Sequence, residues 1–118
     1  MIEVRIDKCD DKRELSLRVK GHAGQAEAGK DIVCASASIL AYTAAQVVKV
    51  MHAHGDLEKE PKIRLKEGDA LIACKPKTDK LYAEALHTYF VIQVGYSLLS
   101  YNYPEYVNLT MFGKGVKP

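Results

Sequence analysis

The sequence of 118 residues contains no tryptophan and only three cysteines, Cys9, Cys34 and Cys74. An odd number of cysteines without a CxxC pair argues against a disulfide framework and against a structural zinc site. His52 and His54 have no carboxylate or thiol nearby that completes a metal-binding set, so we interpret them as a surface pair at a helix end. No glycine-rich phosphate loop of recognised spacing occurs. We therefore expect neither a metal nor another cofactor.

An excess of charge of one sign is also missing, because 17 basic and 15 acidic residues leave a net charge of +2. Nucleic-acid-binding domains normally show a clustered basic face, so direct contact with nucleic acid is not expected. Residues 1–7 alternate apolar and charged side chains, unlike a signal peptide, and no apolar run approaches membrane-spanning length. With free cysteines and no expected membrane contact, we expect a cytoplasmic protein.

Alternation of apolar and polar residues predicts five strands, each with one solvent-exposed face. The predicted strands cover residues 2–7, 15–20, 62–66, 70–74 and 106–112. Residues 10–13 and the pair Gly68-Asp69 are predicted to form the turns of two hairpins.

Helical periodicity predicts two long helices. The first covers about residues 32–52, and an apolar stripe along it is predicted to face the core. These positions are Val33, Ala37, Leu40, Ala44, Val47 and Met51. The second begins after a cap at Thr78 or Asp79 and ends near Ser100. Gly95 either weakens its last turns or allows a close approach there.

The order strand, strand, helix, strand, strand, helix, strand predicts an α+β fold. We expect a two-layer sandwich with two helices on a largely antiparallel five-stranded sheet. A chain of this length fits one domain, which we assign to residues 1–112. Residues 113–118 have no apolar anchor and are predicted to be a flexible tail. The seven tyrosines and the very apolar first helix leave surface for self-association.

The most informative stretch lies between the first hairpin and the first helix, where His22 and Cys34 flank a loop of small residues. Asp31 is a candidate N-cap, which places Cys34 in the first helical turn. The helix dipole favours a thiolate there by only about 0.3 to 1 kcal/mol, whereas lowering the pKa of a thiol by about two units needs roughly 2.7 kcal/mol. A second cation is required, and His22 as imidazolium can supply it. These are the parts of a Cys-His nucleophile pair.

A simpler interpretation of the same two residues has to be weighed beside this one. A free cysteine at an apolar helix start is usually part of the core, and a single histidine after a strand is often a surface residue. On their spacing alone, this simpler interpretation is favoured for Cys34 and His22.

The residues around the pair form a wider block. Gly21-His22-Ala23 is followed by the run GKDIVCA at residues 29–35 and then by Ser38. This block resembles the signature of the ribosomal-processing cysteine protease Prp family. The layout of strands and helices is also similar, so the resemblance covers nearly the whole chain. Ala28 departs from the pattern, since relatives often carry an aromatic residue there, and any loop contact made by such a ring is in doubt.

The resemblance implies a cysteine endopeptidase, with His22 and Cys34 as the catalytic residues, and a homodimer. It also implies the partner, the N-terminal peptide of a precursor of a large-subunit ribosomal protein, from which a short extension is removed. We expect supporting roles for Asp31, which either orients His22 or only caps the helix, and for Ser38, which lies one turn from Cys34 on the same side. Backbone amides at the helix start, including that of Cys34, are candidates to hold the oxyanion.

The segment between His22 and Asp31 is predicted to act as a gating loop. It contains no β-branched or large apolar residue, and Gly21, Gly24 and Gly29 permit backbone angles that other residues avoid. We expect it to be mobile without ligand and to become ordered when a peptide that mimics the extension is bound.

The alternative function is a non-catalytic ribosome- or RNA-associated binding module. It would use basic residues at exposed strand positions, namely Arg5, Arg18, Lys20, Lys62, Arg64 and Lys66. This alternative predicts salt-sensitive RNA binding that does not change in Cys34→Ala. A third, weaker hypothesis is a structural dimer with an inert, buried Cys34.

Overall fold

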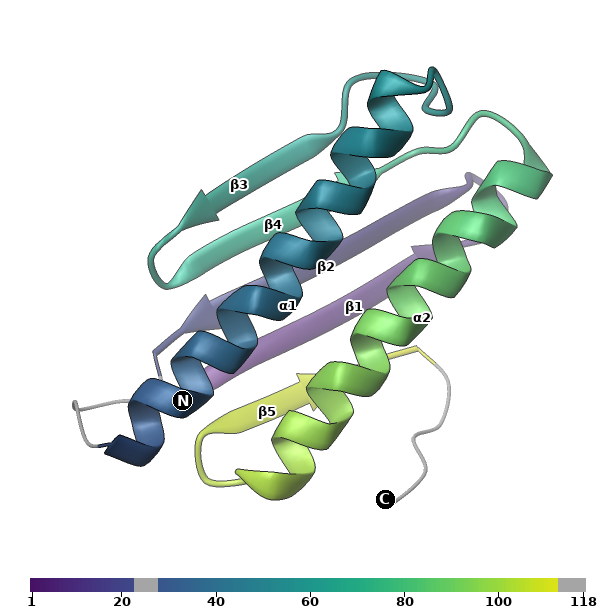
Figure 1. Cartoon of the computed structure of the whole chain (residues 1–118). Helices are drawn as coiled ribbons and strands as arrows, with labels where there is room; N and C mark the ends of the chain where they lie inside the picture. The colour runs from purple at the N-terminus through teal and green to yellow at the C-terminus, as the bar shows by residue number, and fades with distance from the viewer. Residues whose placement is uncertain (23–27, 113–118) are drawn as a thin grey trace.

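In the computed structural model of the chain, residues 1–22 and 28–112 are described, with the backbone alone for residues 28–31. The elements are β1 (Ile2–Cys9), β2 (Glu14–Gly21), α1 (Ala28–Ala53), β3 (Lys62–Lys66), β4 (Asp69–Cys74), α2 (Asp79–Asn102) and β5 (Val107–Thr110), as Figure 1 shows. The predicted order of strands and helices is confirmed. The predicted flexible tail, residues 113–118, lies outside the described residues.

The five strands form one sheet in the order β3-β4-β2-β1-β5. Three of the four neighbouring pairs are antiparallel, and β1 pairs with β5 in parallel. A parallel neighbour needs a crossover connection, and the chain reaches β5 only after α2, which crosses the sheet. The expected largely antiparallel sheet of an α+β fold is therefore confirmed, with one parallel pair at its edge.

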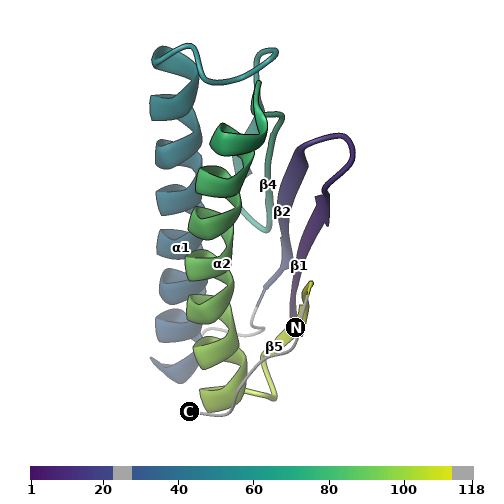
Figure 2. The same cartoon turned by 90° about the vertical axis from the view of Figure 1, so that its right-hand side faces the viewer.

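Both helices lie on the same face of the sheet, as the view from the side shows (Figure 2). Ile2, Val4 and Ile6 of β1 are buried beneath them, whereas the charged residues that alternate with them are exposed. Burying a side chain of this size contributes roughly 1.5 to 3 kcal/mol relative to leaving it in water. The period of two in the sequence thus becomes one apolar face under the helices and one polar face toward solvent.

Helix α1 packs on the sheet mainly through small side chains. Its buried residues are Val33, Ala37, Ala41, Ala44, Ala45 and Val48. Three members of the predicted stripe, Leu40, Val47 and Met51, are only partly buried. The reason is that α1 has two neighbours, the sheet and α2. Its buried surface is therefore wider than a single stripe, and it is centred on the alanines instead of on the predicted stripe.

One sequence expectation about α1 is wrong. We expected no stretch of membrane-spanning length, yet Ile32–Ala53 is long and apolar enough to cross a membrane by length and composition. The core helix of a globular domain passes the same test, and α1 is packed here against the sheet and α2. These two contacts explain its buried apolar residues, whereas apolar residues such as Ile39 and Val50 remain exposed.

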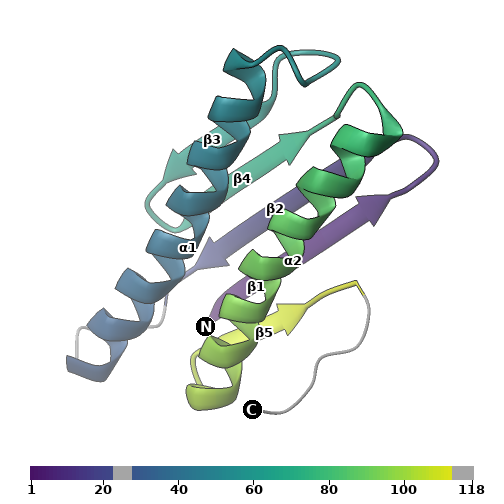
Figure 3. The ribbon, with the colours of Figure 1, turned by 45° about the vertical axis from the view of Figure 1, so that its right-hand side comes forward.

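Helix α2 begins at a side-chain cap and runs beside α1 across the sheet (Figure 3). The hydroxyl oxygen of Thr78 accepts a hydrogen bond from the Leu81 amide at 3.1 Å, so Thr78 is the N-cap. A Cβ at Gly95 would lie 2.6 Å from Cδ2 of Leu40. Gly95 therefore allows the close approach that the sequence suggested, and α1 fills the space.

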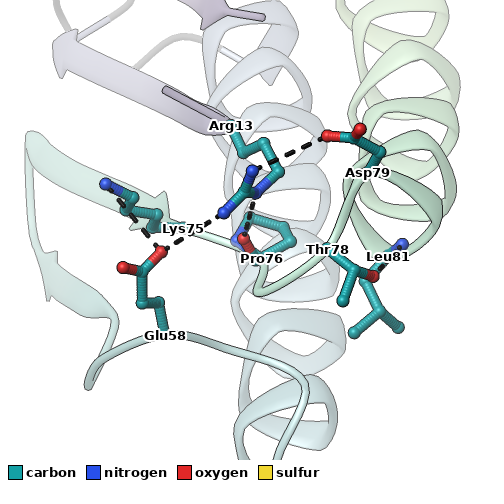
Figure 4. A network of polar contacts seen from close by, with 7 residues as sticks. All are labelled: Arg13, Glu58, Lys75, Pro76, Thr78, Asp79 and Leu81. Atoms are coloured by element: carbon teal, nitrogen blue, oxygen red, sulfur yellow. Dashed lines mark hydrogen bonds and ion pairs between the residues drawn. The ribbon is translucent and has the colours of Figure 1, made fainter. Parts of the chain in front are cut away.

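The end of the sheet near the β1–β2 turn is held by a polar network (Figure 4). Arg13 adopts a φ of 53° in this turn, and its Nε donates to the carbonyl oxygen of Pro76 at 3.1 Å. Its guanidinium also lies 3.7 Å from Glu58 and 3.6 Å from Asp79. One side chain thus connects the β1–β2 turn, the segment before β3 and the start of α2.

We predict that Tyr96→Phe lowers the unfolding free energy by about 1 kcal/mol, because the buried Tyr96 hydroxyl donates to the carbonyl oxygen of Ala37 at 2.8 Å. Thermal unfolding should show a Tm lower by a few degrees. Tyr101→Phe on the same helix is the control, since its side chain is 54% exposed. Equal Tm values for the two variants would contradict the assigned bond.

Candidate active site

His22 directly follows the last residue of β2 and is held by the sheet. Gly21 has a φ of +96°, and a Cβ there would collide with the carbonyl oxygen of Met1. The Gly21 amide donates to the carbonyl oxygen of Gly68 at 3.0 Å, and the amino group of Met1 donates to the carbonyl oxygen of His22 at 2.6 Å. Neighbouring chain segments therefore fix the backbone at His22 from two sides.

Cys34 belongs to α1, where its half-buried side chain packs against the core. The structure corrects the predicted start of this helix, because α1 begins at Ala28 and Asp31 lies inside it. Asp31 is therefore not the N-cap. Gly29 is a poor helix former, but Ala28 and Lys30 are good ones, and an acidic residue in the first turn is favoured by the helix dipole.

The longer helix changes what α1 can offer to Cys34. Cys34 lies in the second turn, beyond the range in which the dipole acts strongly. The amides without partners inside the helix are those of residues 28–31, and the amide of Cys34 has a carbonyl partner four residues earlier. The expected roles of the dipole and of the Cys34 amide as an oxyanion donor therefore do not fit. Activation of the thiol depends more strongly on the imidazole.

A cavity of about 330 Å³ lies between α1 and the β3–β4 turn, and both His22 and Cys34 line it. Its other polar lining residues include Ser38, Tyr42, Glu67 and Asp69. Its apolar lining comes from both layers, and it consists of Ile2, Val19, Ala37, Ala41, Leu65 and Ala70. The cavity thus combines a thiol and an imidazole with an apolar wall. Such a wall can hold an apolar side chain of a ligand.

The other predicted site residues have mixed outcomes. Ser38 lines the cavity together with Cys34, one helical turn away. Gly29 lies in α1, so it does not belong to a loop, and the segment between β2 and α1 is shorter than predicted. The predicted role of Gly24, the mobility of the loop and the expected interaction of Asp31 with His22 concern parts outside the described residues and side chains.

Sequence reasoning missed the contribution of the β3–β4 turn to this cavity. Leu65, Glu67 and Gly68 lie more than 30 positions from Cys34 in the sequence, yet they line the same cavity. Their position follows from the pairing of β4 with β2, which brings Asp69 opposite Lys20. The turn signal at Gly68 was visible in the sequence, but the neighbour of β2 in the sheet was not.

The remaining two cysteines differ in environment. Cys9 is exposed, and Cys74 is buried with its thiol 3.8 Å from the hydroxyl of Tyr89. Burial raises the pKa of Cys74 to about 11, so this thiol remains protonated at neutral pH. Among the described residues, no group of three or more potential metal ligands occurs. Cys34 is thus distinguished from the other thiols by its place on a cavity beside His22.

The fold and this cavity define the class of the protein: an α+β domain with a thiol and an imidazole on one accessible site is a candidate cysteine hydrolase. The family model of the cysteine protease Prp matches residues 1–108. The chain belongs to this family of cysteine proteases. Among curated proteins, none matches the sequence significantly.

Solved structures with the same fold include proteins from two bacteria. SMU.848 from Streptococcus mutans shares 24% identity at a TM-score of 0.65, covering 97% of this chain and 96% of that one. The essential ribosomal processing protease Prp of S. aureus, in complex with a substrate peptide, shares 22% identity at a TM-score of 0.65. The match covers 94% of this chain and 99% of that one. The same protein in complex with a covalently linked product peptide shares 25% identity at a TM-score of 0.67. This match also covers 94% of this chain and 99% of that one.

The family assignment favours the protease over the non-catalytic RNA-binding alternative. The six basic residues of that alternative do lie on the outer face of the sheet by strand alternation. Two of them are already paired, since Arg5 lies 2.7 Å from Asp7 and Arg64 lies 2.9 Å from Asp69. Both pairs reduce the net positive charge of the face.

We predict that iodoacetamide at pH 8 modifies Cys34 and Cys9 in the folded protein but leaves Cys74 unmodified, because Cys74 is buried and its pKa is raised. Mass spectrometry of proteolytic fragments measures the modified fraction of each cysteine. Denatured protein is the control, in which Cys74 should react as well. Modification of native Cys74 as fast as Cys9 would contradict this assignment.

Proposed function

We propose that His22 and Cys34 are the catalytic pair of this cysteine protease. The observation that carries the proposal is that one cavity is lined by both residues, although they come from different layers of the fold. The cysteine protease family of the chain supports it. Neither of the other thiols lines this cavity: Cys9 lies at the end of β1, and Cys74 is enclosed beside Tyr89.

In the proposed mechanism, His22 accepts the proton of Cys34, and the thiolate sulfur attacks the scissile carbonyl carbon. The tetrahedral intermediate collapses to a thioester while His22 protonates the departing amine. His22 then removes a proton from water, which hydrolyses the thioester and returns the free thiol. Cys34 is thus the nucleophile, and His22 is in turn the general acid and the general base.

Two further residues are proposed to support the pair. Ser38 exposes a hydroxyl group on the cavity wall one turn after Cys34, within reach of a substrate backbone. Asp31 lies in the first turn of α1, and we propose that its carboxylate orients His22 or anchors the start of the helix. A carboxylate close to the thiol also opposes thiolate formation, so Asp31 is assigned a supporting role only.

We infer that the substrate is the N-terminal extension of a large-subunit ribosomal protein precursor, cleaved in the cytoplasm. A similarly folded protein, the Prp of S. aureus, is named a ribosomal processing protease and has been captured with a substrate peptide. The apolar wall of the cavity, which includes Val19, Leu65 and Ala70, suits an apolar peptide side chain. No cofactor takes part in this mechanism.

We also propose that the protein forms a homodimer through the outer face of its helices. On α2, Val91, Val94 and Leu98 follow one another at helical spacing and are between 43% and 55% exposed. Ile39 of α1 is 60% exposed. Large apolar side chains gathered on one exposed face are typical of an interface, and a second copy of the same face would cover them.

The test of the catalytic pair is Cys34→Ser with a peptide that spans the ribosomal protein extension. We expect no measurable turnover, because a serine hydroxyl stays protonated beside the same imidazole. Cys9→Ser is the matched control, since Cys9 is exposed, and it should retain full activity. Cleavage by Cys34→Ser at the rate of the unchanged protein would show that the nucleophile has been assigned wrongly.

The test of the dimer is Val94→Lys, which places a charge in the centre of the proposed interface. Sedimentation velocity should show a monomer at concentrations at which the unchanged protein is a dimer. Thr110→Lys is the control and should remain a dimer, because Thr110 is exposed and pairs with Arg5 on the face of the sheet away from the helices. The same sedimentation coefficient for all three proteins would rule out this surface.

A further inference from the structure

We propose that Gly68, in the turn between β3 and β4, is a positioning residue for His22. The inference rests on the proposed catalytic role of His22. A Cβ built on Gly68 would lie 2.5 Å from Nε2, 2.8 Å from Cε1 and 3.4 Å from Cδ2 of His22. The outer edge of the imidazole therefore occupies the space that any other residue at position 68 would fill.

The turn itself explains why a glycine is tolerated here, but not why only a glycine fits. Gly68 has a φ of +71°, in the left-handed region that glycine adopts without strain. Asparagine also enters this region readily, so backbone conformation alone allows Asn at such a position. With His22 in its present position, the contact with the imidazole disfavours both Asn and Ala, because each carries a Cβ.

A backbone hydrogen bond fixes the turn relative to the histidine. The Gly21 amide donates to the carbonyl oxygen of Gly68 at 3.0 Å, so the residue before His22 is joined to the same turn that its ring contacts. Strand pairing between Lys66 and Asp69 closes the turn, and Asp69 pairs in turn with Lys20 of β2. The turn is thus a fixed wall beside the imidazole.

A Cβ at position 68 would move the imidazole rather than unfold the domain. Side-chain contacts of a Cβ essentially never fall below 3.0 Å, and His22 is exposed, so its ring can rotate away from the turn. Proton transfer requires the two heavy atoms to lie about 2.6 to 3.2 Å apart. A displacement of about 1 Å reduces catalysis by roughly a hundredfold.

The structure contains a matched control for backbone strain. Gly55, after the end of α1, has a φ of +75°, and a Cβ there would have nothing within 4 Å. Gly68→Ala and Gly55→Ala therefore introduce the same unfavourable φ, but only the first meets the imidazole. Any difference between the two variants in catalysis reports on the contact with His22.

The experiment compares Gly68→Ala, Gly68→Asn, Gly55→Ala and His22→Ala in the full chain, with the peptide that spans the ribosomal protein extension. We expect both alanine variants of glycine to lower the Tm by similar amounts, and Gly68→Asn to lower it less. Both variants of Gly68 should lower kcat at least tenfold with KM changed less than threefold, whereas Gly55→Ala should retain kcat within twofold. The pH profile of iodoacetamide alkylation at Cys34 should shift in Gly68→Ala toward that of His22→Ala.

Three outcomes would overturn the proposal, and they are distinguishable. Full activity in His22→Ala would show that the proposed catalytic pair itself is wrong. Loss of activity in His22→Ala, with an unchanged kcat and alkylation profile in both variants of Gly68, would leave the pair intact and remove the positioning role. An equal loss of kcat in Gly68→Ala and Gly55→Ala would assign the effect to backbone strain.

Discussion

Burial of a single apolar sheet face under two helices is the constraint on which the rest of the structure depends. The alanines of α1, such as Ala41 and Ala45, let its backbone approach the sheet, and Gly95 lets α2 approach α1. The site follows from this packing, because α1 lies across β4 and β2 and thereby brings Cys34 to the end of β2. The cavity is the space that remains between the first turns of α1 and the β3–β4 turn.

Local patterns predicted the elements well, because each is determined by residues that are neighbours in sequence. Alternation at Ile2, Val4 and Ile6 gave a strand with one buried face, and Thr78 gave the start of α2. The His22 and Cys34 pair was also visible as residues flanking one short segment. Its interpretation as a catalytic pair depended on the wider block around it, since the spacing alone favours a core thiol and a surface imidazole.

Features that depend on distant parts of the chain were not predictable in the same way. Nothing in the sequence states that β4 lies beside β2, and hence that Gly68 meets His22. The start of α1 was misjudged because Asp31 is suited both to an N-cap and to a first helical turn. The parallel pairing of β1 with β5 is similarly fixed only by the path of α2 over the sheet.

The two residues of the proposed pair belong to different layers of the fold. The imidazole is attached to the sheet layer through β2 and the β3–β4 turn, and the thiol is attached to the helix layer through α1. Their relative position is therefore set by how α1 packs on the sheet. Side chains such as Ala44 and Val48, which lie further along α1 and do not line the cavity, are buried in that packing. The buried contacts between the helices and the sheet thus position the two residues of the proposed pair, although most of these contacts lie outside the cavity.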